Sequence, residues 1–164
     1  MSLLSRVRIA LRPETVYAHC DIPCGIYDPH EAQVAAHTVV RMMDLISELP
    51  TKSGITEADR QALMTRYVAT KETHAERVKH EVRIIWGDFF KEDHLKAAPD
   101  LHATVWKIMK LGSQARQTTD KKVADSLLAE VNKFAEMFWK AKEKPTQTAK
   151  AAYPTGKELV LPKL

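Results

Sequence analysis

The chain has 164 residues, of which 45% are hydrophobic and 28% are charged, and only two are cysteines. This length fits one domain with a buried core, and the composition is that of an ordinary globular protein. The formal net charge is only +4 and the basic residues are interleaved with acids, so no nucleic-acid partner is expected. No apolar run approaches the length of a membrane-spanning helix, so no membrane partner is expected either.

The N-terminal segment, residues 1–18, differs in composition from the rest of the chain. It carries three arginines and a single acid, Glu14, and it ends on Val16-Tyr17-Ala18, where the spacing of small residues resembles a processing site. Its apolar stretch is short and interrupted by arginine and proline, which makes it a poor secretory signal. We therefore predict a propeptide that is removed after Ala18, and a cytoplasmic protein. The alternative is an N-terminal arm that stays attached.

Apolar residues recur at helical spacing in four stretches, at residues 29–49, 57–90, 100–117 and 121–143. Asp28 and Pro29 are typical of a helix start, with Glu31 as the capping-box partner. Thr56 is placed to cap the second helix, and Thr119 or Asp120 the fourth. A loop is expected at 91–99. These patterns predict an all-α fold in which residues 29–144 form a four-helix bundle.

The last segment, residues 145–164, contains three prolines among lysines and threonines. Proline interrupts regular secondary structure because it lacks the amide hydrogen. We expect an extended C-terminal tail that lies against a neighbouring subunit.

The two cysteines lie in a compact loop at residues 19–28, HCDIPCGIYD, which we call the hook. If the chain begins at His19, the terminal amine, the backbone nitrogen of Cys20 and the Cys20 thiolate close two adjacent chelate rings. The Cys24 thiolate then completes a planar site of two nitrogens and two sulfurs, a geometry that suits Ni(II) or Cu(II). The His19 imidazole is available as an axial ligand. Strong thiolate and amide donors favour an oxidised metal ion, which indicates redox chemistry that requires the free amine.

Two other interpretations of the cysteines remain open at this point. Cys20 and Cys24 could form a small disulfide loop, or they could bind zinc together with two of the remaining histidines. The histidines available for such a site are His30, His37, His74, His80, His94 and His102. An iron–sulfur cluster would need further cysteines, and the chain has none.

The run from His19 to Pro29, HCDIPCGIYDP, resembles the mature N-terminus of nickel superoxide dismutases. Weaker similarity continues through residues 30–143 and is clearest at Lys79-His80, Trp86, Asp88 through Lys91, Pro99, Leu101-His102 and Phe138-Trp139. The resemblance implies a four-helix bundle assembled as a homohexamer, with one nickel ion per subunit. It implies that Ni(II)/Ni(III) cycling converts superoxide to dioxygen and hydrogen peroxide. It also implies a processing protease and a possible nickel-loading partner.

The resemblance further implies roles for individual hook residues. Nickel would be bound by the amine and imidazole of His19, by the backbone nitrogen and sulfur of Cys20, and by the sulfur of Cys24. Tyr27 would be the catalytic residue that gates the pocket and orders small anions or water. Asp21 and Pro23 would hold and shape the loop. No organic cofactor is implied.

The chain departs from the family pattern around the axial imidazole. A glutamate and an arginine that orient this ring in relatives align with Ala35 and His74, and a nearby tyrosine aligns with Phe89. Lys91 is a candidate for steering superoxide. Three charged residues are candidate substitutes for the missing pair: Glu31, Glu72 and Arg77.

Two other functions compete with the dismutase hypothesis. A nickel or copper carrier would use the same hook without turnover. A helical interaction module would need neither the metal nor the free amine.

Overall fold

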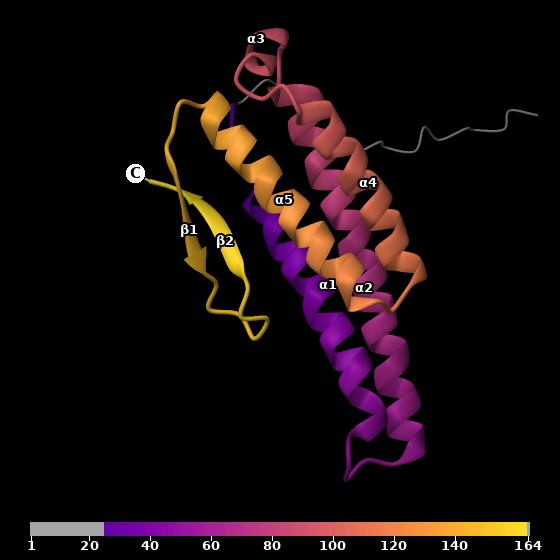
Figure 1. Cartoon of the computed structure of the whole chain (residues 1–164). Helices are drawn as coiled ribbons and strands as arrows, with labels where there is room; N and C mark the ends of the chain where they lie inside the picture. The colour runs from indigo at the N-terminus through magenta and orange to yellow at the C-terminus, as the bar shows by residue number, and fades with distance from the viewer. Residues whose placement is uncertain (1–24, 164) are drawn as a thin grey trace, which may run out of the picture.

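The computed structural model describes residues 25–163, in which four long helices form an elongated bundle with a small β-hairpin on one side (Figure 1). No helix in this part of the chain is long and apolar enough to cross a membrane. The elements in chain order are α1 (His30–Glu48), η1 (Leu49–Thr51), α2 (Glu57–Ile84), η2 (Ile85–Phe89), α3 (Glu92–Leu95), α4 (Leu101–Gln117), α5 (Lys121–Ala141), β1 (Thr146–Lys150) and β2 (Glu158–Pro162).

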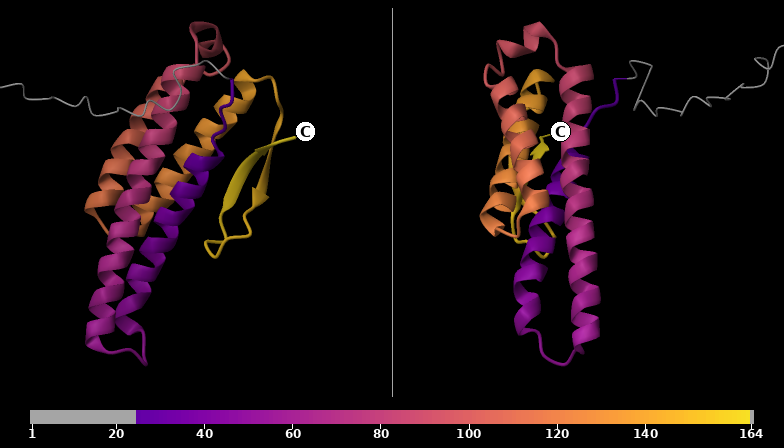
Figure 2. Two further views of the ribbon diagram at one scale, coloured as in Figure 1. Left: turned by 180° about the vertical axis from the view of Figure 1, so that it is seen from behind. Right: turned by 90° about the vertical axis from the view of Figure 1, so that its right-hand side faces the viewer.

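The predicted four-helix bundle is confirmed. Figure 2 shows α1 and α2 as a long antiparallel pair that extends beyond α4 and α5 at one end. The core lies between the four helices and is mostly aliphatic. Phe134 and Phe138 enter it from the C-terminal half of α5. Its fully buried members include Val39, Met43, Val78, Ile108, Leu127, Phe134 and Phe138.

Two helix starts follow directly from local sequence. The Thr56 hydroxyl accepts a hydrogen bond from the Asp59 amide at 3.1 Å and donates one to the Asp59 carboxylate at 2.7 Å. The Asp120 carboxylate accepts from the Lys122 amide at 2.9 Å. Each side chain satisfies an amide that has no carbonyl partner in the first turn. Of the two candidate caps for α5, the structure uses Asp120.

The start of α1 differs in one respect from the expected capping box. The Asp28 carboxylate accepts from the His30 amide at 2.8 Å, as a capping aspartate should. The Glu31 side chain forms an ion pair with Arg77 of α2 instead of turning back to its own helix end. A tertiary partner has replaced the local one.

The predicted second helix ends in a π-helical turn, and the predicted loop at 91–99 contains a short helix. At Ile85 the helix widens into the π-helical turn η2, where the Phe90 amide donates to the Ile85 carbonyl at 3.3 Å. The short helix α3 follows, and His94 Nδ1 accepts from the Lys91 amide at 3.2 Å to cap it. Such widened turns occur often at functional sites.

One lysine is buried where α2 crosses the end of α4. The Lys71 side chain is 2% exposed, and its Nζ donates to the carbonyls of Arg116 at 3.0 Å and Thr118 at 2.7 Å. Carbonyls at a helix C-terminus lack partners within the helix, so a cation is stabilising there. Desolvation lowers the pKa of Lys71 below its ordinary value.

The C-terminal tail is a β-hairpin on the chain's own bundle and not an irregular extended arm, while its predicted contact with a neighbouring subunit stays a prediction. β1 and β2 pair antiparallel, with Thr148 opposite Val160. The Gln33 side chain of α1 accepts from the Val160 amide at 2.8 Å and donates to the Val160 carbonyl at 3.1 Å. The three prolines flank or end the strands, so the interior of each strand keeps its amide hydrogens.

Candidate metal centre

The predicted nickel ligands lie outside the described part of the chain: His19, Cys20 and Cys24. The two residues predicted to hold and shape the loop, Asp21 and Pro23, also lie outside it. Within residues 25–163, no group of three or more His, Cys, Asp or Glu side chains is placed to hold a metal ion.

The described chain starts at the end of the hook, where the ring of Tyr27 contacts the bundle. Gly25 adopts a positive φ of 73°, a conformation that favours glycine. Ile26 is 79% exposed. The next side chain, Tyr27, is partly buried, and its ring centroid lies 5.9 Å from that of Phe89 in η2. Tyr27 thus holds the described end of the hook against η2.

Phe89 belongs to a cluster of rings that we call the aromatic platform, made of Phe89, Phe90, Phe134 and Phe138. The centroid of the Phe89 ring lies 4.7 Å from that of Phe138 and 5.1 Å from that of Phe90. His94 of α3 stacks on Phe89 at 5.2 Å with an interplanar angle of 17°. The platform therefore joins η2, α3 and α5 beneath Tyr27, which explains how the widened turn and the short helix position the base of the hook.

A positive charge lies over this platform. Lys142, just after α5, places Nζ 5.1 Å from the Phe138 centroid and 5.6 Å from the Phe89 centroid. A cation over a ring face is attracted by the ring quadrupole. Sequence analysis missed Lys142, although its position four residues after Phe138 was a usable signal for a shared helix face. Lys91, the predicted steering residue, is exposed at the start of α3.

The acidic and basic candidates near the hook end of α1 do come together. Glu31 in the first turn of α1 pairs with Arg77 of α2, and Arg77 also lies 3.8 Å from Glu81. Both Glu31 and Arg77 are at least half exposed. The pair places a guanidinium of α2 beside a carboxylate in the first turn of α1, the helix that directly follows the hook.

Ala35 and His74, the positions that align with the imidazole-orienting glutamate and arginine of relatives, have different surroundings. Ala35 is 1% exposed and belongs to the hydrophobic core. His74 is partly buried, and its Nδ1 donates to the Thr70 carbonyl of its own helix at 2.9 Å. This bond holds the ring along α2, so only the other ring nitrogen is left for a further partner.

Comparison with known proteins addresses the class to which this bundle and hook belong. Residues 14–142 match the sequence profile of the family described as nickel-containing superoxide dismutase. The chain is 33% identical over 129 residues to the superoxide dismutase [Ni] of Streptomyces coelicolor, which covers 79% of this chain and 92% of the relative. It is 31% identical over 128 residues to that of Streptomyces seoulensis, with 78% and 91% covered.

Solved structures agree with the sequence comparison. The native nickel superoxide dismutase structure at 1.30 Å superimposes with a TM-score of 0.65 at 31% identity, covering 76% of this chain and 99% of that one. An apo structure of nickel superoxide dismutase gives a TM-score of 0.62 at 28% identity, covering 73% and 99%. The matched residues end at 142, so β1 and β2 lie outside the family profile.

These findings first define the class: a helical-bundle metalloenzyme that acts on superoxide. More specifically, the chain belongs to the nickel-containing superoxide dismutase family. Superoxide dismutation is the function of this family and nickel is its metal, so the chain is an oxidoreductase with superoxide as substrate.

The donor groups in the hook fit nickel. An amine, a backbone amide and two thiolates make the two-nitrogen, two-sulfur set that suits planar Ni(II). The family match spans residues 19–24, which contain all of these donors. The carrier and interaction-module hypotheses lose their support, because the family is one of enzymes.

Proposed function

We propose that the dismutation takes place at the hook, with His19, Cys20 and Cys24 as the nickel ligands and one nickel ion per subunit. His19 would contribute its terminal amine and imidazole, Cys20 its backbone nitrogen and thiolate, and Cys24 its thiolate. When bound, the metal supplies a Ni(II)/Ni(III) couple that accepts an electron from one superoxide and donates one to the next. The observation that carries the proposal is a family match spanning all of these residues and continuing into the bundle.

The chain's own side chains would position the substrate and the ligands. Tyr27 is held on the aromatic platform through Phe89, which supports a role in keeping small anions and water in place beside the hook. Lys142 lies over the same platform and would attract the superoxide anion toward it. Asp21 and Pro23 would stabilise the loop between the two cysteines.

The Glu31–Arg77 ion pair is our candidate for the support of the axial imidazole. It provides a carboxylate and a guanidinium, while Ala35 and His74 cannot form such a pair. Outer residues that orient a ligating histidine commonly change metal affinity or activity by about 10- to 100-fold when removed. The pair would therefore affect turnover more than it affects folding.

Maturation follows from the requirement for a free amine. In the full-length chain the nitrogen of His19 is an amide, which is a weaker ligand than an amine. We propose that residues 1–18 are a propeptide, that a protease cleaves after Ala18, and that nickel binds then, with or without a loading partner. Residues 19–28 would be the hook, 29–144 the bundle, and 145–164 a C-terminal extension.

The assembly and the compartment are further parts of the proposal. A homohexamer would let neighbouring subunits enclose the hooks, and exposed apolar residues near the hook end of the bundle support such contacts. These are Ile26, which is 79% exposed, and Trp86, which is 39% exposed. A cytoplasmic location would keep both thiols reduced until nickel arrives.

The test is to measure intact mass, nickel content and superoxide decay on the same sample purified from the native host. We expect a mass that starts at His19, about one nickel per chain and decay far above the spontaneous rate. A full-length mass with Cys20 and Cys24 joined and no nickel would call for cleavage after Ala18 in vitro, followed by nickel loading. A cleaved, nickel-treated chain that binds nickel without turnover would contradict the proposed site.

A further inference from the structure

The outer edge of the C-terminal hairpin presents backbone groups without partners among residues 25–163. In the β1–β2 ladder, the Ala151 amide donates to the Lys157 carbonyl at 3.0 Å and the Lys163 amide donates to the Pro145 carbonyl at 2.8 Å. Antiparallel strands alternate between residues that bond to the partner strand and residues that face away from it. The odd-numbered residues of β1 therefore face β2, and Thr146, Thr148 and Lys150 direct their amides and carbonyls outward.

The same alternation is visible on β2, where the outward groups are occupied. Both backbone groups of Val160 bond to the Gln33 side chain, as described above. The Glu158 carbonyl accepts from His37 Nε2 at 3.2 Å and from Asn132 Nδ2 at 3.0 Å. Side chains of α1 and α5 thus close one edge of the hairpin and hold it on the bundle. Figure 1 shows β2 next to the helices and β1 on the far side.

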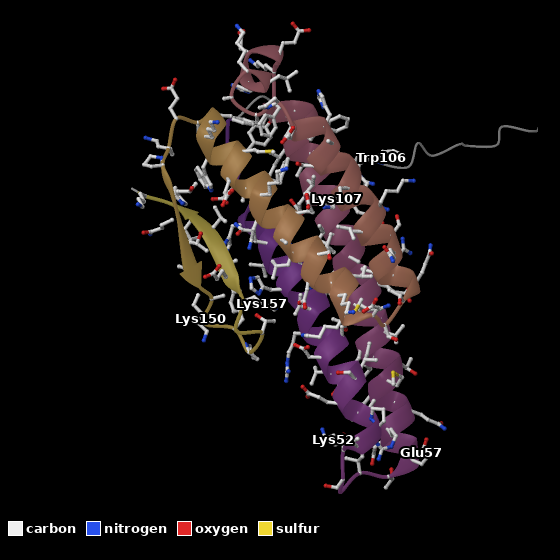
Figure 3. All side chains as sticks on the ribbon, in the orientation of Figure 1. Lys52, Glu57, Trp106, Lys107, Lys150 and Lys157 are labelled. Carbon is white, nitrogen blue, oxygen red and sulfur yellow. The ribbon has the colours of Figure 1, made fainter. Side chains whose placement is uncertain are left out.

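Three of the five side chains of β1 are exposed to solvent. Gln147, Thr148 and Lys150 are exposed. Figure 3 shows Lys150 at the outer side of the hairpin, while Lys157 lies near α5, where its Nζ is 3.2 Å from the Asp125 carboxylate. An edge strand with open backbone groups is a template for pairing with another strand.

We propose that the outer edge of β1 pairs antiparallel with β1 of a second copy of this chain, about a two-fold axis at Thr148. The two hairpins would then form one continuous four-stranded sheet. Because the hairpin lies outside the family profile, this contact is separate from any assembly made by the bundle. It does not depend on nickel or on cleavage after Ala18.

The choice of a second copy follows from the residues that this symmetry brings together. Thr148 lies opposite Thr148 of the partner subunit, and threonine pairs are favourable across strands. Lys150 lies opposite Thr146 of the partner subunit, so no like charges face one another. A two-fold axis needs one self-complementary patch, and this strand provides one. Its shortness and its lysine are features that usually protect an edge, and this register accommodates both.

Engineered disulfides test the register directly in full-length chain carrying Cys20→Ser and Cys24→Ser. Directly opposite residues of a hydrogen-bonded pair have Cα atoms about 5.5 Å apart, which suits a disulfide. Thr148→Cys chains should therefore cross-link under mild oxidation. Gln147→Cys is the matched control, because the two-fold places its two copies roughly 8 Å apart, beyond the usual limit of about 7 Å.

We expect Thr148→Cys to form covalent dimers at least about tenfold faster than Gln147→Cys, with both variants folded by circular dichroism. Equal rates, or no cross-linking of either, would overturn the proposal. A second pair guards against a folding defect: Thr146→Cys chains mixed with Lys150→Cys chains should form the mixed dimer. Adding Thr148→Pro to both chains should abolish it, because proline removes an outward amide while leaving the β1–β2 bonds intact. A mixed dimer that persists with proline would likewise contradict backbone pairing.

Discussion

The guanidinium of Arg77 on α2 forms an ion pair with the carboxylate of Glu31 in the first turn of α1, linking residues 46 positions apart. We expect Glu31→Gln to lower kcat/KM by about tenfold, because the group proposed to support the axial imidazole loses its charge. Stability should change by less than about 1 kcal/mol, since the pair is exposed. Superoxide decay and thermal unfolding measure the two effects.

Glu81→Gln is the matched control for this prediction. It removes the other carboxylate near Arg77 while leaving Glu31 in place. If Glu81→Gln lowers kcat/KM as much as Glu31→Gln does, the loss comes from removing any negative charge near Arg77 and not from breaking the Glu31–Arg77 pair. The charge-swapped double variant, Glu31→Arg with Arg77→Glu, should fold normally without restoring full activity, because the carboxylate then lies on the wrong helix.

Tyr27 should act through its hydroxyl in turnover and through its ring in holding the hook. Tyr27→Phe keeps the contact with Phe89, so we expect normal nickel content together with a higher KM for superoxide. Tyr27→Ala also removes the ring, and we expect it to lower nickel occupancy and to destabilise the chain by about 1–3 kcal/mol. Nickel analysis and steady-state kinetics distinguish the two. Tyr153→Phe, at the hairpin, should change neither quantity.

Lys142 should accelerate the encounter with superoxide. Lys142→Glu reverses the charge over the aromatic platform, and we expect kcat/KM to fall by about 3- to 10-fold at low ionic strength. The difference should shrink as salt is added, because exposed charges are screened. Lys110→Glu is the control, since Lys110 also lies over a ring, that of Trp106 at 4.4 Å, on a different helix. A loss that does not depend on salt would contradict steering.

Lys71 should make stability depend on pH in the alkaline range. Its pKa is lowered in the folded chain, so below the ordinary value of 10.5 the unfolded chain binds more protons. The free energy of unfolding should therefore rise as pH increases toward 10.5, and Lys71→Met should remove that slope. We also expect Lys71→Met to cost about 1–3 kcal/mol at neutral pH, because two helix-end carbonyls lose their donor. Urea unfolding at several pH values measures both, with exposed Lys122→Met as the control.

His37 should make attachment of the hairpin sensitive to acid. The ring is 3% exposed and lies between the Thr155 hydroxyl at 2.9 Å and the Glu158 carbonyl. Burial lowers the pKa of His37 below 6.5 while the hairpin is attached. As pH falls below 6.5, the chain with the hairpin detached and His37 exposed therefore binds a proton more readily. Stability present above pH 6.5 should be lost as pH decreases through the window beneath it.

Hydrogen exchange at the hairpin amides gives a local readout of this loss. We expect the acid-dependent increase in exchange to disappear in His37→Gln. Asn132→Ala removes another donor to the same Glu158 carbonyl without removing a titratable group. It should loosen the hairpin equally at every pH, and an acid dependence that vanished in Asn132→Ala would contradict the role of His37.

The sequence by itself determined those features whose interacting groups are neighbours in the chain. Helical periodicity marks the four long helices, and the capping bonds of Thr56 and Asp120 join residues two or three positions apart. The proposed nickel donors are of the same kind, because the amine of His19 and the amide and thiolate of Cys20 are consecutive and Cys24 is four residues further on. Local chemistry of this sort needs no knowledge of the fold.

Only the tertiary structure decided which distant groups meet. Glu31 fits a local capping box, yet it pairs with Arg77 once α1 and α2 lie side by side. Lys71 is buried against the end of α4, although lysines are mostly exposed in folded proteins. Prolines in residues 145–164 suggest an irregular arm, yet the segment forms a hairpin whose Val160 amide and carbonyl both bond to the Gln33 side chain. In each case the free energy comes from burying or pairing a group that is satisfied by water when the chain is unfolded, and that partner exists only after the helices have packed.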